Sequence, residues 1–562
     1  MPADTYDVIV LGAGAGGMTA AATAATRGCR VLLIEKSPLV GGTTAISGGM
    51  VWIPANSKMT SVGLSDPIVN ARQYLEQTIA TPLRYEMRET FLAHADRAIR
   101  YLEANTSVQF RAVQRYPDYY PDLPGATLGG RVLEPVPFDG RELGRRFSVL
   151  RPPLPEFTLF GGMMIDRADI PHFRHVTKSM RSAFRVARLV ARHGLQRLRN
   201  ARGTSLVLGN ALAARLFQSL LQSGVEVRLN TKVAELLTNG QAVTGVRLGS
   251  DGQQDIRARY GVVIATGGFS HNAVMRRRYL PSMVTLSAAT KGSAGDGIAL
   301  AVGAGGVLRE GAINNAFWLP VSRFKRRDGS EAIFPHTVTD RSKPGVIAVD
   351  RKGRRFTNEA RSYHEFVLAM LNAQSDERNP AYLICDRRFL WTYGLGAIKP
   401  FALSWRPFLE QGYLHEGRDI AELARKIGID PDRLTTAVDF FNHEAVEGRD
   451  PEFGRGNDAY QRHLGDADVT PNPCVRPIDR PPYYAIAIFP GDLGTAAGLA
   501  TDRNGQVLDQ HDRPIAGLYS CGNDMASVME GAYPGPGITL GPALTFGFLI
   551  AEQLADSRNH AS

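Results

Sequence analysis

The fold of this chain is decided by residues 7–17, which read Asp7-Val8-Ile9-Val10-Leu11-Gly12-Ala13-Gly14-Ala15-Gly16-Gly17. The apolar, β-branched start predicts a buried strand, and the alanine-rich stretch 18–27 predicts the helix that follows it. Gly12, Gly14 and Gly17 stand at the spacing G-x-G-x-x-G, and a second strand over 30–34 ends in Glu35, about 20 residues further on. This order of elements predicts a dinucleotide-binding unit: a strand, the glycines, a helix, a second strand and an acid.

Each of these residues has an expected physical role. Gly12 makes the tight turn, Gly14 lets the backbone approach a pyrophosphate, and Gly17 lets helix and strand pack closely. Phosphates bind at a helix N-terminus because free N–H groups and the helix dipole favour negative charge there. Glu35 can accept hydrogen bonds from a ribose hydroxyl. Taken alone, this unit leaves NAD and FAD both open.

The composition is that of a globular protein large enough for two or more structural units, with 562 residues, 44% hydrophobic and 21% charged. Its four cysteines lie far apart and form no C-x-x-C pair, so we expect neither a disulfide framework nor a metal site, and a reducing compartment. A strand begins close to the N-terminus, and no apolar run reaches the length of about 18 residues typical of a membrane span. We therefore expect a cytoplasmic protein without a signal peptide.

Further glycine-rich stretches extend the predicted cofactor site. The stretch 41–49, Gly41-Gly42-Thr43-Thr44-Ala45-Ile46-Ser47-Gly48-Gly49, follows the ribose-binding acid and is expected to run beneath the same cofactor. The apolar run 261–264 predicts a buried strand ending in Ala265-Thr266-Gly267-Gly268. In the tail, Gly522-Asn523-Asp524 follows a strand, and Tyr533-Pro534-Gly535-Pro536-Gly537 precedes a helix predicted over 542–555. The N-terminus of that helix can face the negative edge of a flavin ring.

Positive charge is concentrated in residues 170–202. This segment holds nine Lys or Arg and no Asp or Glu, so without them the net charge of +10 falls to +1. At helical spacing one apolar face is expected, flanked by a row of arginines. The face consists of Met180, Ala183, Phe184, Val186, Ala187, Val190 and Ala191, and the row of Arg181, Arg185, Arg188 and Arg192. This pattern is typical of a helix lying on an anionic membrane surface.

Two different roles stay open for this basic segment: a solvated helix packed on the protein body, and a site for a partner protein. Nucleic acid is not expected as a partner, because no recognition motif and no stacking aromatics accompany the charge. If the membrane interpretation holds, the protein is cytoplasmic and peripheral on the inner face of the cell membrane.

Taken together, these motifs resemble the fumarate-reductase-like flavoproteins and, within them, the 3-ketosteroid Δ1-dehydrogenases. The resemblance covers nearly the full length except roughly 150–202. Besides the glycine motifs it includes Arg355-Phe356-x-Asn358-Glu359 followed by Tyr363. The arginine-and-histidine carboxylate clamp expected of a fumarate reductase is not evident, and tyrosines that suit a neutral ketone stand in its place.

The resemblance implies an α/β fold in which a Rossmann-like FAD-binding domain carries an inserted α+β catalytic (cap) domain, as in the fumarate reductase flavoprotein. Residues from about 320 to 490 carry more charge, more aromatics and fewer glycine turns than the rest of the chain. We therefore expect residues 1–322, with the basic insert 150–202, and residues 491–562 to form the FAD-binding domain. Residues 323–490 are then the catalytic substrate domain.

The cofactor that the resemblance implies is FAD. The residues expected to bind it are Gly12, Gly14, Ala15, Gly16, Gly17, Glu35, Lys36, Gly42, Thr43, Thr44, Ser47, Gly48, Gly49, Val233, Ala265, Thr266, Gly267, Asp296, Gly522, Asn523, Gly537 and Leu540.

The chemistry implied is 1,2-desaturation of a 3-ketosteroid. A tyrosine base removes a proton from C2 while C1 gives a hydride to flavin N5, and the pKa of the base must lie below its usual value near 10. By motif match Tyr363 resembles the base and Tyr119 its hydrogen-bonding helper, with Tyr120 as a one-residue alternative. The Tyr533 hydroxyl and the Gly537 backbone N–H resemble the pair that holds the C3 oxygen. For each tyrosine, ordinary packing is the alternative role.

The substrate is then a small-molecule 3-ketosteroid, with bulky sterol-derived compounds such as cholest-4-en-3-one favoured, and the electron acceptor a quinone or another oxidant. A 3-oxo-5α-steroid 4-dehydrogenase is the close rival; in those relatives a serine stands two residues after the tail tyrosine, where this chain has Gly535. The same glycine motifs also fit a fumarate-reductase-like enoate reductase, or a non-enzymatic flavin-containing membrane electron carrier.

Overall fold

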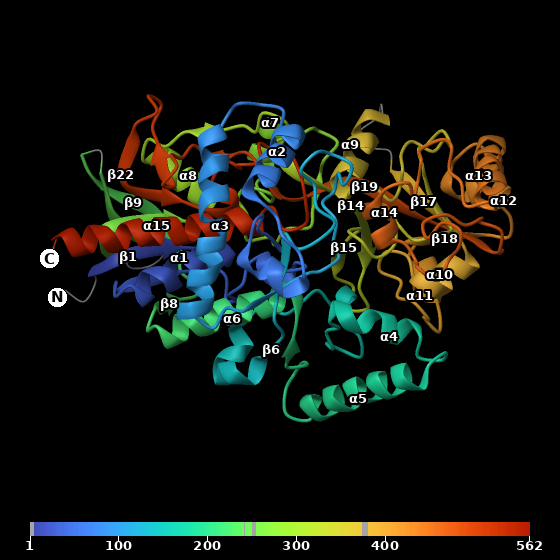
Figure 1. Cartoon of the computed structure of the whole chain (residues 1–562), viewed down its shortest axis with the longest axis horizontal. Helices are drawn as coiled ribbons and strands as arrows, with labels where there is room; N and C mark the ends of the chain where they lie inside the picture. Colours follow the sequence, from blue (N-terminus) through green and yellow to red (C-terminus); the bar gives the residue numbers. More distant parts are fainter. Residues whose placement is uncertain (1–4, 241, 250–253, 374–379, 562) are drawn as a thin grey trace.

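Two β-sheets lie one after the other along the long axis of the molecule (Figure 1). The structure is a computed structural model that describes residues 5–240, 242–249, 254–373 and 380–561. Both chain ends lie at the end of the molecule that holds the first sheet (Figure 1). The α/β class expected from the sequence is confirmed.

The first sheet has the strand order β21-β22-β11-β1-β2-β8. At its centre β1 (Thr5–Leu11) pairs in parallel with β2 (Val31–Ile34) and with β11 (Asp255–Ile264). Strand β2, most of β1 and the second half of β11 are apolar in a continuous run, because helices cover both faces of a parallel sheet. The remaining strands of this order are β8 (Glu226–Arg228), β21 (Gln506–Leu508) and β22 (Pro514–Ser520). A hairpin of β9 (Lys232–Asn239) and β10 (Ala242–Gly249) extends the sheet from β11.

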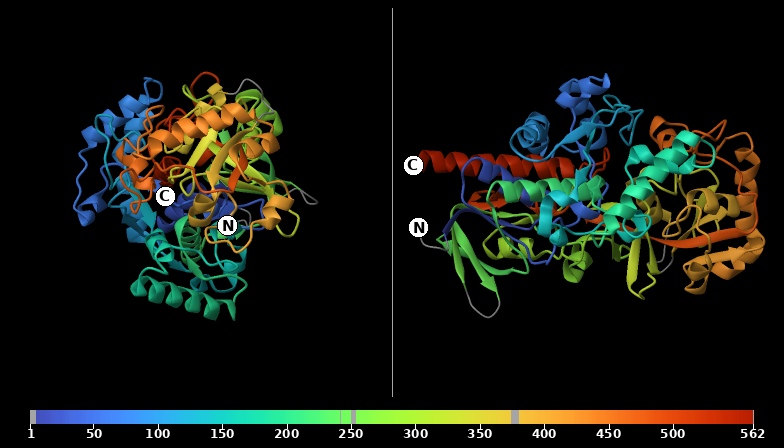
Figure 2. Two further views of the ribbon diagram at one scale, coloured as in Figure 1. Left: turned by 90° about the vertical axis from the view of Figure 1, so that its right-hand side faces the viewer. Right: turned by 90° about the horizontal axis from the view of Figure 1, so that it is seen from below.

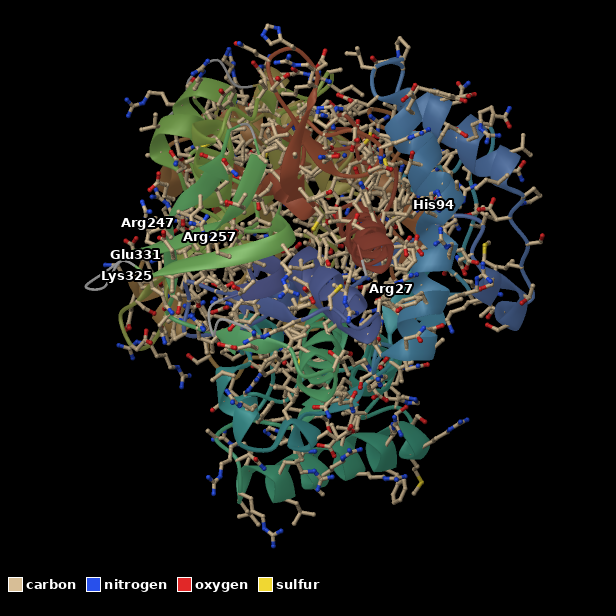
Figure 3. All side chains as sticks on the ribbon, turned by 90° about the vertical axis from the view of Figure 1, so that its left-hand side faces the viewer. Arg27, His94, Arg247, Arg257, Lys325 and Glu331 are labelled. Carbon is tan, nitrogen blue, oxygen red and sulfur yellow. The ribbon has the colours of Figure 1, made fainter. Side chains whose placement is uncertain are left out.

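Helix α1 (Ala15–Thr26) packs against the long C-terminal helix α15 (Leu540–Ala561). Small residues allow the close approach: a Cβ on Gly547 would lie 2.7 Å from the Gly16 carbonyl oxygen. At the end of α1, Arg27 (labelled in Figure 3) forms an ion pair of 2.5 Å with Glu552 of α15. Helices α6 (Leu208–Gln222), which packs on α1, and α3 (Tyr85–Asn105), which packs on α15, complete this layer. The tail of the chain is therefore built into the same unit as its start.

The second sheet is organised around its longest strand, β19 (Tyr483–Thr495). On one side of it lie β14 (Ala316–Lys325) and β15 (Glu331–Pro335), and on the other β17 (Ala381–Asp386) and β16 (Val346–Val349). The short strands β12 (Leu286–Ser287) and β18 (Leu414–Gly417) also pair with β19. The helices of this part are α9 (Tyr363–Ala373), α10 (Arg387–Tyr393), α11 (Arg406–Glu410), α12 (Ile420–Ile427), α13 (Pro431–Ala445) and α14 (Ala459–Leu464).

Smaller elements connect these two sheets. Strands β3 (Val51–Trp52), β5 (Val132–Pro135) and β4 (Phe110–Ala112) form a third, short sheet that contacts α6 and α15, and β13 (Leu308–Arg309) pairs with β20 (Gly498–Leu499). The remaining helices are α2 (Ile68–Thr78), α7 (Ala273–Tyr279) and α8 (Asp296–Gly303), and β6 (Phe138–Asp139) pairs with β7 (Ser205–Leu206).

The basic segment forms an arm whose long helix stands away from both sheets, whereas its short first helix lies close to the body (Figures 1 and 2). It consists of α4 (Ile170–Arg174) and α5 (Met180–Arg197), which contact each other. After the arm the chain returns to the body at β7, which pairs with β6. Of the helices in the described ranges, none is both long enough and apolar enough to cross a membrane.

Candidate active site

A cavity of about 650 Å³ runs from the glycine turn after β1 to the start of α9 beside the second sheet. The ends of β1, β2 and β11 contribute Leu11, Ile34 and Ala265 to its wall. Ligands bind at the carboxyl ends of the strands in open α/β sheets, because the chain turns there expose backbone N–H groups. The predicted dinucleotide site and the predicted tyrosine site therefore share one cavity.

The glycine turn fits a pyrophosphate. Gly12 has φ of +105°, and a Cβ there would lie 2.2 Å from the Ala265 carbonyl oxygen, so only glycine fits this turn. A Cβ on Gly14 would meet nothing within 4 Å, because this residue faces the cavity. Gly17 lies outside the cavity wall: its Cα faces the Gly12 carbonyl, and a Cβ would lie 2.1 Å from that oxygen.

Glu35 is fixed in the cavity wall by two backbone hydrogen bonds. Its carboxylate accepts the Ala13 N–H at 2.9 Å and the Ser37 N–H at 2.8 Å. Each carboxylate oxygen has a second lone pair, so a ribose hydroxyl can still be accepted. The neighbouring Lys36 forms an ion pair with Asp296 across the cavity.

The structure brings all but one of the predicted cofactor residues to the cavity wall, and Gly17 is the exception. Besides Gly12, Gly14, Glu35, Lys36 and Asp296, the wall contains Ala15, Gly16, Gly42, Thr43, Thr44, Ser47, Gly48, Gly49, Val233, Ala265, Thr266, Gly267, Gly522, Asn523, Gly537 and Leu540. The Thr44 hydroxyl accepts the Ala15 N–H at 3.1 Å, which ties the second glycine stretch to the first.

Asp524 joins the tail to the turn after β11, a role that the sequence did not reveal. Its buried carboxylate accepts the N–H groups of Gly267 at 2.9 Å and Gly268 at 3.1 Å, and also that of Thr266. Burial raises the pKa of Asp524, and these donors oppose that rise. The sequence analysis recognised the motif Gly522-Asn523-Asp524. It gave no sign that Asp524 accepts hydrogen bonds from a turn more than 250 residues away.

The tyrosines predicted for catalysis form one cluster. Tyr363 is the first residue of α9, and its hydroxyl donates a hydrogen bond of 2.7 Å to the Tyr533 hydroxyl. The Tyr119 ring lies 5.5 Å from the Tyr533 ring, stacked on it, and 5.7 Å from the Tyr363 ring, edge on. All three side chains are buried in the protein and belong to residues of the cavity wall.

The choice between Tyr119 and Tyr120 is decided by where each side chain lies. The Tyr120 hydroxyl donates to the Glu365 carboxylate at 2.6 Å, and Tyr120 is not part of the cavity wall. Tyr119 lines the cavity. The geometry therefore places Tyr119, and not its neighbour, beside Tyr363.

The protein chain itself does not lower the pKa of the predicted base, contrary to the expectation from the sequence. Burial raises the pKa of Tyr363 well above its usual value of 10.0, and burial likewise raises the pKa of Tyr119 and Tyr533. The adjacent His364 is held neutral, because burial lowers its pKa to about 3. Its Nδ1 accepts the Trp318 N–H at 3.1 Å, so it is not free to act as a base.

Gly537 presents its backbone to the cavity at the end of the tail loop. Its φ of +96° favours glycine, and a Cβ would lie 2.4 Å from the Met50 carbonyl oxygen. Among the described residues, no protein group accepts the Gly537 N–H, whereas its carbonyl accepts the Trp52 and Gly541 N–H groups at 3.2 and 2.9 Å. A substrate oxygen is thus a suitable acceptor for this N–H group.

Sequence reasoning missed the wall that the 150–170 segment supplies. Apolar side chains of this segment line the cavity, namely Leu154, Phe157, Leu159, Met164, Ile165 and Ile170. Arg167 of this segment and Lys399, which donates to its Pro155 carbonyl, are among the cations of the wall. The alternation of prolines and large apolar residues over 152–165 is the one signal that could have suggested a folded wall in place of a surface insert.

Comparison with known proteins gives a consistent result. Residues 7–540 match the family model described as FAD binding domain. The 3-oxosteroid 1-dehydrogenase of Mycobacterium tuberculosis is 35% identical, with 99% of each chain covered. The 4-oxocyclohex-2-ene-1-carboxylate 5-dehydrogenase of Sinomonas cyclohexanicum is 38% identical, covering 98% of this chain and 93% of the relative.

Solved structures agree with the fold. The 3-ketosteroid Δ1-dehydrogenase of Sterolibacterium denitrificans, solved with 1,4-androstadiene-3,17-dione, superimposes with a TM-score of 0.92 at 38% identity and covers 99% of this chain and 100% of that one. A flavocytochrome c3 fumarate reductase shares the fold alone, with a TM-score of 0.64 at 21% identity. The chain therefore belongs to the FAD-binding-domain family of flavoproteins, together with the 3-oxosteroid 1-dehydrogenases.

Proposed function

We propose that this protein is an FAD-dependent oxidoreductase that introduces the C1–C2 double bond into 3-ketosteroids. The observation that carries the proposal is the Tyr363–Tyr533 hydroxyl pair, 2.7 Å apart, in the same cavity as Gly537 and the glycine turn. The 35% and 38% identical relatives that act on 3-ketosteroids support the same reaction.

Each residue of the tyrosine site has its own role in the proposed reaction. Tyr533 and the Gly537 N–H hold the C3 oxygen and stabilise the negative charge that develops on it. Tyr363, in its tyrosinate form, removes the proton from C2, so a C–H bond breaks and the tyrosine O–H bond forms. FAD, which the glycine turn at Gly12 and Gly14 and the carboxylate of Glu35 would hold, would supply the acceptor for the hydride that leaves C1. Tyr119 fixes both hydroxyls by packing on the two other rings.

The position of Gly535 supports 1,2- over 4,5-desaturation. A Cβ there would lie 2.7 Å from the Trp52 indole nitrogen and 3.3 Å from the Asp118 carboxylate. These two groups already share a hydrogen bond of 2.9 Å, so they close the place where the 4-dehydrogenases carry a serine. An enoate reductase is disfavoured because, among the described residues of the cavity wall, none is a histidine.

Bulky sterol-derived ketones such as cholest-4-en-3-one are the substrates that the apolar wall fits best. The wall supplied by the 150–170 segment faces the cavity with large apolar side chains and is continuous with α4 through Ile170. Burying such side chains against a sterol is favourable by about 25 cal/mol per Å² of apolar surface.

A single-ring keto acid is the second candidate substrate. Two relatives in Sinomonas cyclohexanicum, 38% and 35% identical, are dehydrogenases of 4-oxocyclohexene- and 4-oxocyclohexanecarboxylate. Arg167 and Lys399 in the cavity wall are cations that suit a carboxylate. Both already have protein partners: Arg167 pairs with Glu134 at 3.3 Å, and Lys399 donates to the Pro155 and Thr158 carbonyls. Glu134 neutralises the charge of Arg167, and this favours the uncharged steroid.

We also propose that the arm docks on an anionic membrane surface. The exposed apolar stripe of the arm is made of Met180, Phe184, Ala187, Ala191, Leu195 and Leu198. Exposed arginines line one side of it, at positions 181, 188, 192 and 199. In Figure 3 the helix stands at the edge of the molecule with side chains directed away from the body. Apolar and cationic side chains in adjacent rows suit the interface of a bilayer.

The sequence analysis predicted some of the residues of this exposed face wrongly. Ala183, Val186 and Val190 are half-buried and face the arm's inner side with the buried Ser182 and His193. Arg185, predicted in the outer row, is bonded at 2.9 Å to Asp169. The helix is rotated relative to the prediction because Asp169 and the Phe160 carbonyl, which bonds His193 at 3.0 Å, fix its inner side.

Two further assignments belong to this proposal. We assign residues 323–490, which hold most of the second sheet, as the catalytic substrate domain, and residues 1–322 and 491–562 as the FAD-binding domain. Strands β14 and β19 run across both of these limits, so the two parts share a sheet at the cavity. A membrane quinone is the electron acceptor that suits a protein docked at the bilayer. We assign the protein to the inner face of the cell membrane on the same hypothesis.

The test is a substrate comparison on purified holoprotein. Without oxygen, a 3-ketosteroid should bleach the visible flavin band, and kcat/KM with an artificial acceptor should rank cholestenone-like ketones above 4-oxocyclohexanecarboxylate. The reverse ranking would favour the keto-acid candidate. Bound flavin that no ketone bleaches would favour the electron carrier.

A further inference from the structure

The turn 311–314, which precedes β14, holds the part of the tail that leads to Tyr533. Two backbone N–H groups of the turn donate to the Glu530 carbonyl, at 2.9 and 3.3 Å, and a third donates to the Glu530 carboxylate at 3.0 Å. A Cβ on Gly531 would lie 2.0 Å from the Asn314 carbonyl oxygen, so the two segments touch at their backbones. This contact ends two residues before Tyr533.

The backbone of Glu530 is strained at this contact. Its φ of +53° lies in the left-handed region that residues other than glycine seldom adopt, and the residue is 2% exposed. Its carboxylate lies 3.4 Å from the guanidinium of Arg84, whose side chain is also buried. A strained conformation of this kind persists only where the surrounding contacts fix it. The tail therefore has a defined position on the turn 311–314.

The side chain of Asn314 joins the tail to strand β14. Its amide nitrogen donates to the Gly531 carbonyl at 3.1 Å, and its amide oxygen accepts the Trp318 indole N–H at 2.9 Å. The reverse orientation of the amide would put oxygen against the carbonyl and nitrogen against the indole N–H. Asn314 is thus fixed in one orientation between the two segments.

Trp318 also fixes the residue that follows Tyr363. Its backbone N–H donates to Nδ1 of His364 at 3.1 Å, and the His364 ring centre lies 5.7 Å from that of Tyr533. His364 is neutral and its Nδ1 accepts an N–H, so Nε2 carries the ring proton. The approach of Nε2 to the Asn314 amide nitrogen at 3.4 Å is therefore a packing contact. Asn314 and Trp318 together connect the helix of Tyr363 with the tail of Tyr533.

Ring packing around Tyr533 does not by itself fix the position of its hydroxyl. The rings of Tyr119 and Phe317 each lie 5.5 Å from the Tyr533 ring, the first stacked and the second edge on. Apolar packing has little directional preference, so these contacts permit the ring to slide along its own plane. The directional hydrogen bond from Asn314 to Gly531 fixes the backbone from which this ring extends.

We propose that Asn314 is a positioning residue that keeps the Tyr533 hydroxyl in contact with Tyr363, acting through Gly531. The inference rests on the proposed function, in which these two tyrosines engage the C3 oxygen and a C2 hydrogen of one ketone. Asn314 lies outside the cavity wall and so does not touch the substrate. A displacement of about 1 Å between groups that must act together costs about 10²-fold in rate.

The test is a double-mutant cycle in the holoprotein. Asn314→Ala and Asn314→Asp are each made alone and together with Tyr533→Phe. Asn314→Asp keeps the size of the side chain and the acceptor for the Trp318 indole, and removes only the N–H that Gly531 accepts. It decides the point if Asn314→Ala does not fold. The first readout is kcat and KM for a 3-ketosteroid with an artificial acceptor.

Asn442→Ala is the matched control. Asn442 is a half-buried asparagine of α13, as Asn314 is of its turn, and lies outside the cavity wall. It also makes two hydrogen bonds: its amide donates to the Ile478 carbonyl at 2.9 Å and accepts the Ile478 N–H at 2.7 Å. Asn442→Ala should leave kcat and KM unchanged.

We expect Asn314→Ala to lower kcat about 10²-fold and to change KM little, because the displaced hydroxyl acts in the transition state. Together with Tyr533→Phe, which has already removed that hydroxyl, it should cost a further factor of roughly 2 or less. Gly537 is held separately by the Trp52 N–H, so the second donor to the C3 oxygen stays in place. An equal loss in both backgrounds would overturn the proposal, as would wild-type kcat in Asn314→Ala.

The second readout needs no turnover. Fluorine NMR of protein made with fluorotyrosine reports the surroundings of its 18 tyrosines, and the Tyr533 signal is the one missing from Tyr533→Phe. Asn314→Ala should shift or broaden this signal, whereas an unchanged signal would overturn the proposal. If the wild type binds FAD and no steroid bleaches it, the proposed function fails, and the fluorine signal still decides whether Asn314 positions Tyr533.

Discussion

The Tyr363 hydroxyl donates to the Tyr533 hydroxyl at 2.7 Å, although 170 residues separate the two in sequence. Tyr363 is the first residue of helix α9, beside the second sheet. Tyr533 lies in the C-terminal tail, which returns to the first sheet. The pair therefore forms only when both parts of the chain are folded together. A base and an oxygen-binding donor in contact can engage two neighbouring atoms of one ketone, the C3 oxygen and a C2 hydrogen.

Tyr363→Phe should abolish desaturation while FAD stays bound. Removing a positioned base lowers the rate by about 10²–10⁴-fold. The measurement is anaerobic flavin bleaching by a 3-ketosteroid, with the visible spectrum reporting bound FAD. Tyr382→Phe serves as the control for loss of a buried hydroxyl elsewhere. Unchanged bleaching in Tyr363→Phe would remove this residue from the mechanism.

Tyr533→Phe should lower kcat more than it changes KM. Its hydroxyl stabilises charge that develops on the C3 oxygen in the transition state, and one such donor accounts for about 10²–10³-fold in rate. The ring itself is kept, so packing on Tyr119 at 5.5 Å persists. Steady-state kinetics decide the point: a rise in KM at constant kcat would mean that Tyr533 only binds the substrate.

The free energy of unfolding should fall at alkaline pH. Burial raises the pKa of Tyr74, Tyr119, Tyr363, Tyr460 and Tyr533 above the usual 10.0, so the folded state binds more protons than the unfolded state once the unfolded tyrosines ionise. Their contribution is complete below pH 10 and is lost as the pH rises above it. Urea unfolding at several pH values measures this, and stability that increases between pH 10 and 11 would contradict it.

Asp524→Ala should weaken FAD binding. The substitution leaves three backbone N–H groups of the turn 266–268 without their acceptor, at a cost of about 1–3 kcal/mol for each buried group. The melting temperature and the flavin content of the purified protein report both effects. Asp328→Ala, at an exposed loop, is the control. Full flavin content and wild-type stability in Asp524→Ala would show that the turn does not depend on this carboxylate.

Serine substitutions in the exposed stripe of the arm should abolish binding to anionic vesicles. Phe184 is 73% exposed, Leu195 68% and Leu198 80%, so changing them to Ser removes membrane contacts at little cost to folding. Flotation with anionic liposomes measures binding, which added salt should weaken. Leu403, fully exposed on another part of the surface, gives the matched control Leu403→Ser. Wild-type protein that never floats with anionic vesicles would rule out the docking surface.

Local sequence patterns predicted the first sheet and most of the cofactor residues in the cavity wall. They could do so because a glycine turn, or an acid at a strand end, is determined by residues close to it in the chain. The strand, turn and helix of residues 5–26 follow from β-branched and glycine positions, and Glu35 follows from its place at a strand end. Motif resemblance located Tyr363 and Tyr533.

Features that depend on distant packing were not predicted. Tyr460 and Asp524 acquire their partners only when segments more than 100 residues apart meet. The 150–170 wall belongs to a segment with no resemblance to a motif, and the rotation of α5 depends on Asp169, a residue just outside the basic run. No periodicity in the sequence encodes these contacts.

The most direct measurement of the central claim is the position of the new double bond. Purified holoprotein is incubated with an artificial acceptor and either a 4-ene-3-ketosteroid or its 5α-reduced analogue, and the products are identified by mass spectrometry and NMR. The account predicts a C1–C2 double bond in both products, and no product from Tyr363→Phe. A C4–C5 double bond formed in the 5α-reduced analogue, with the 4-ene steroid left unchanged, would contradict it.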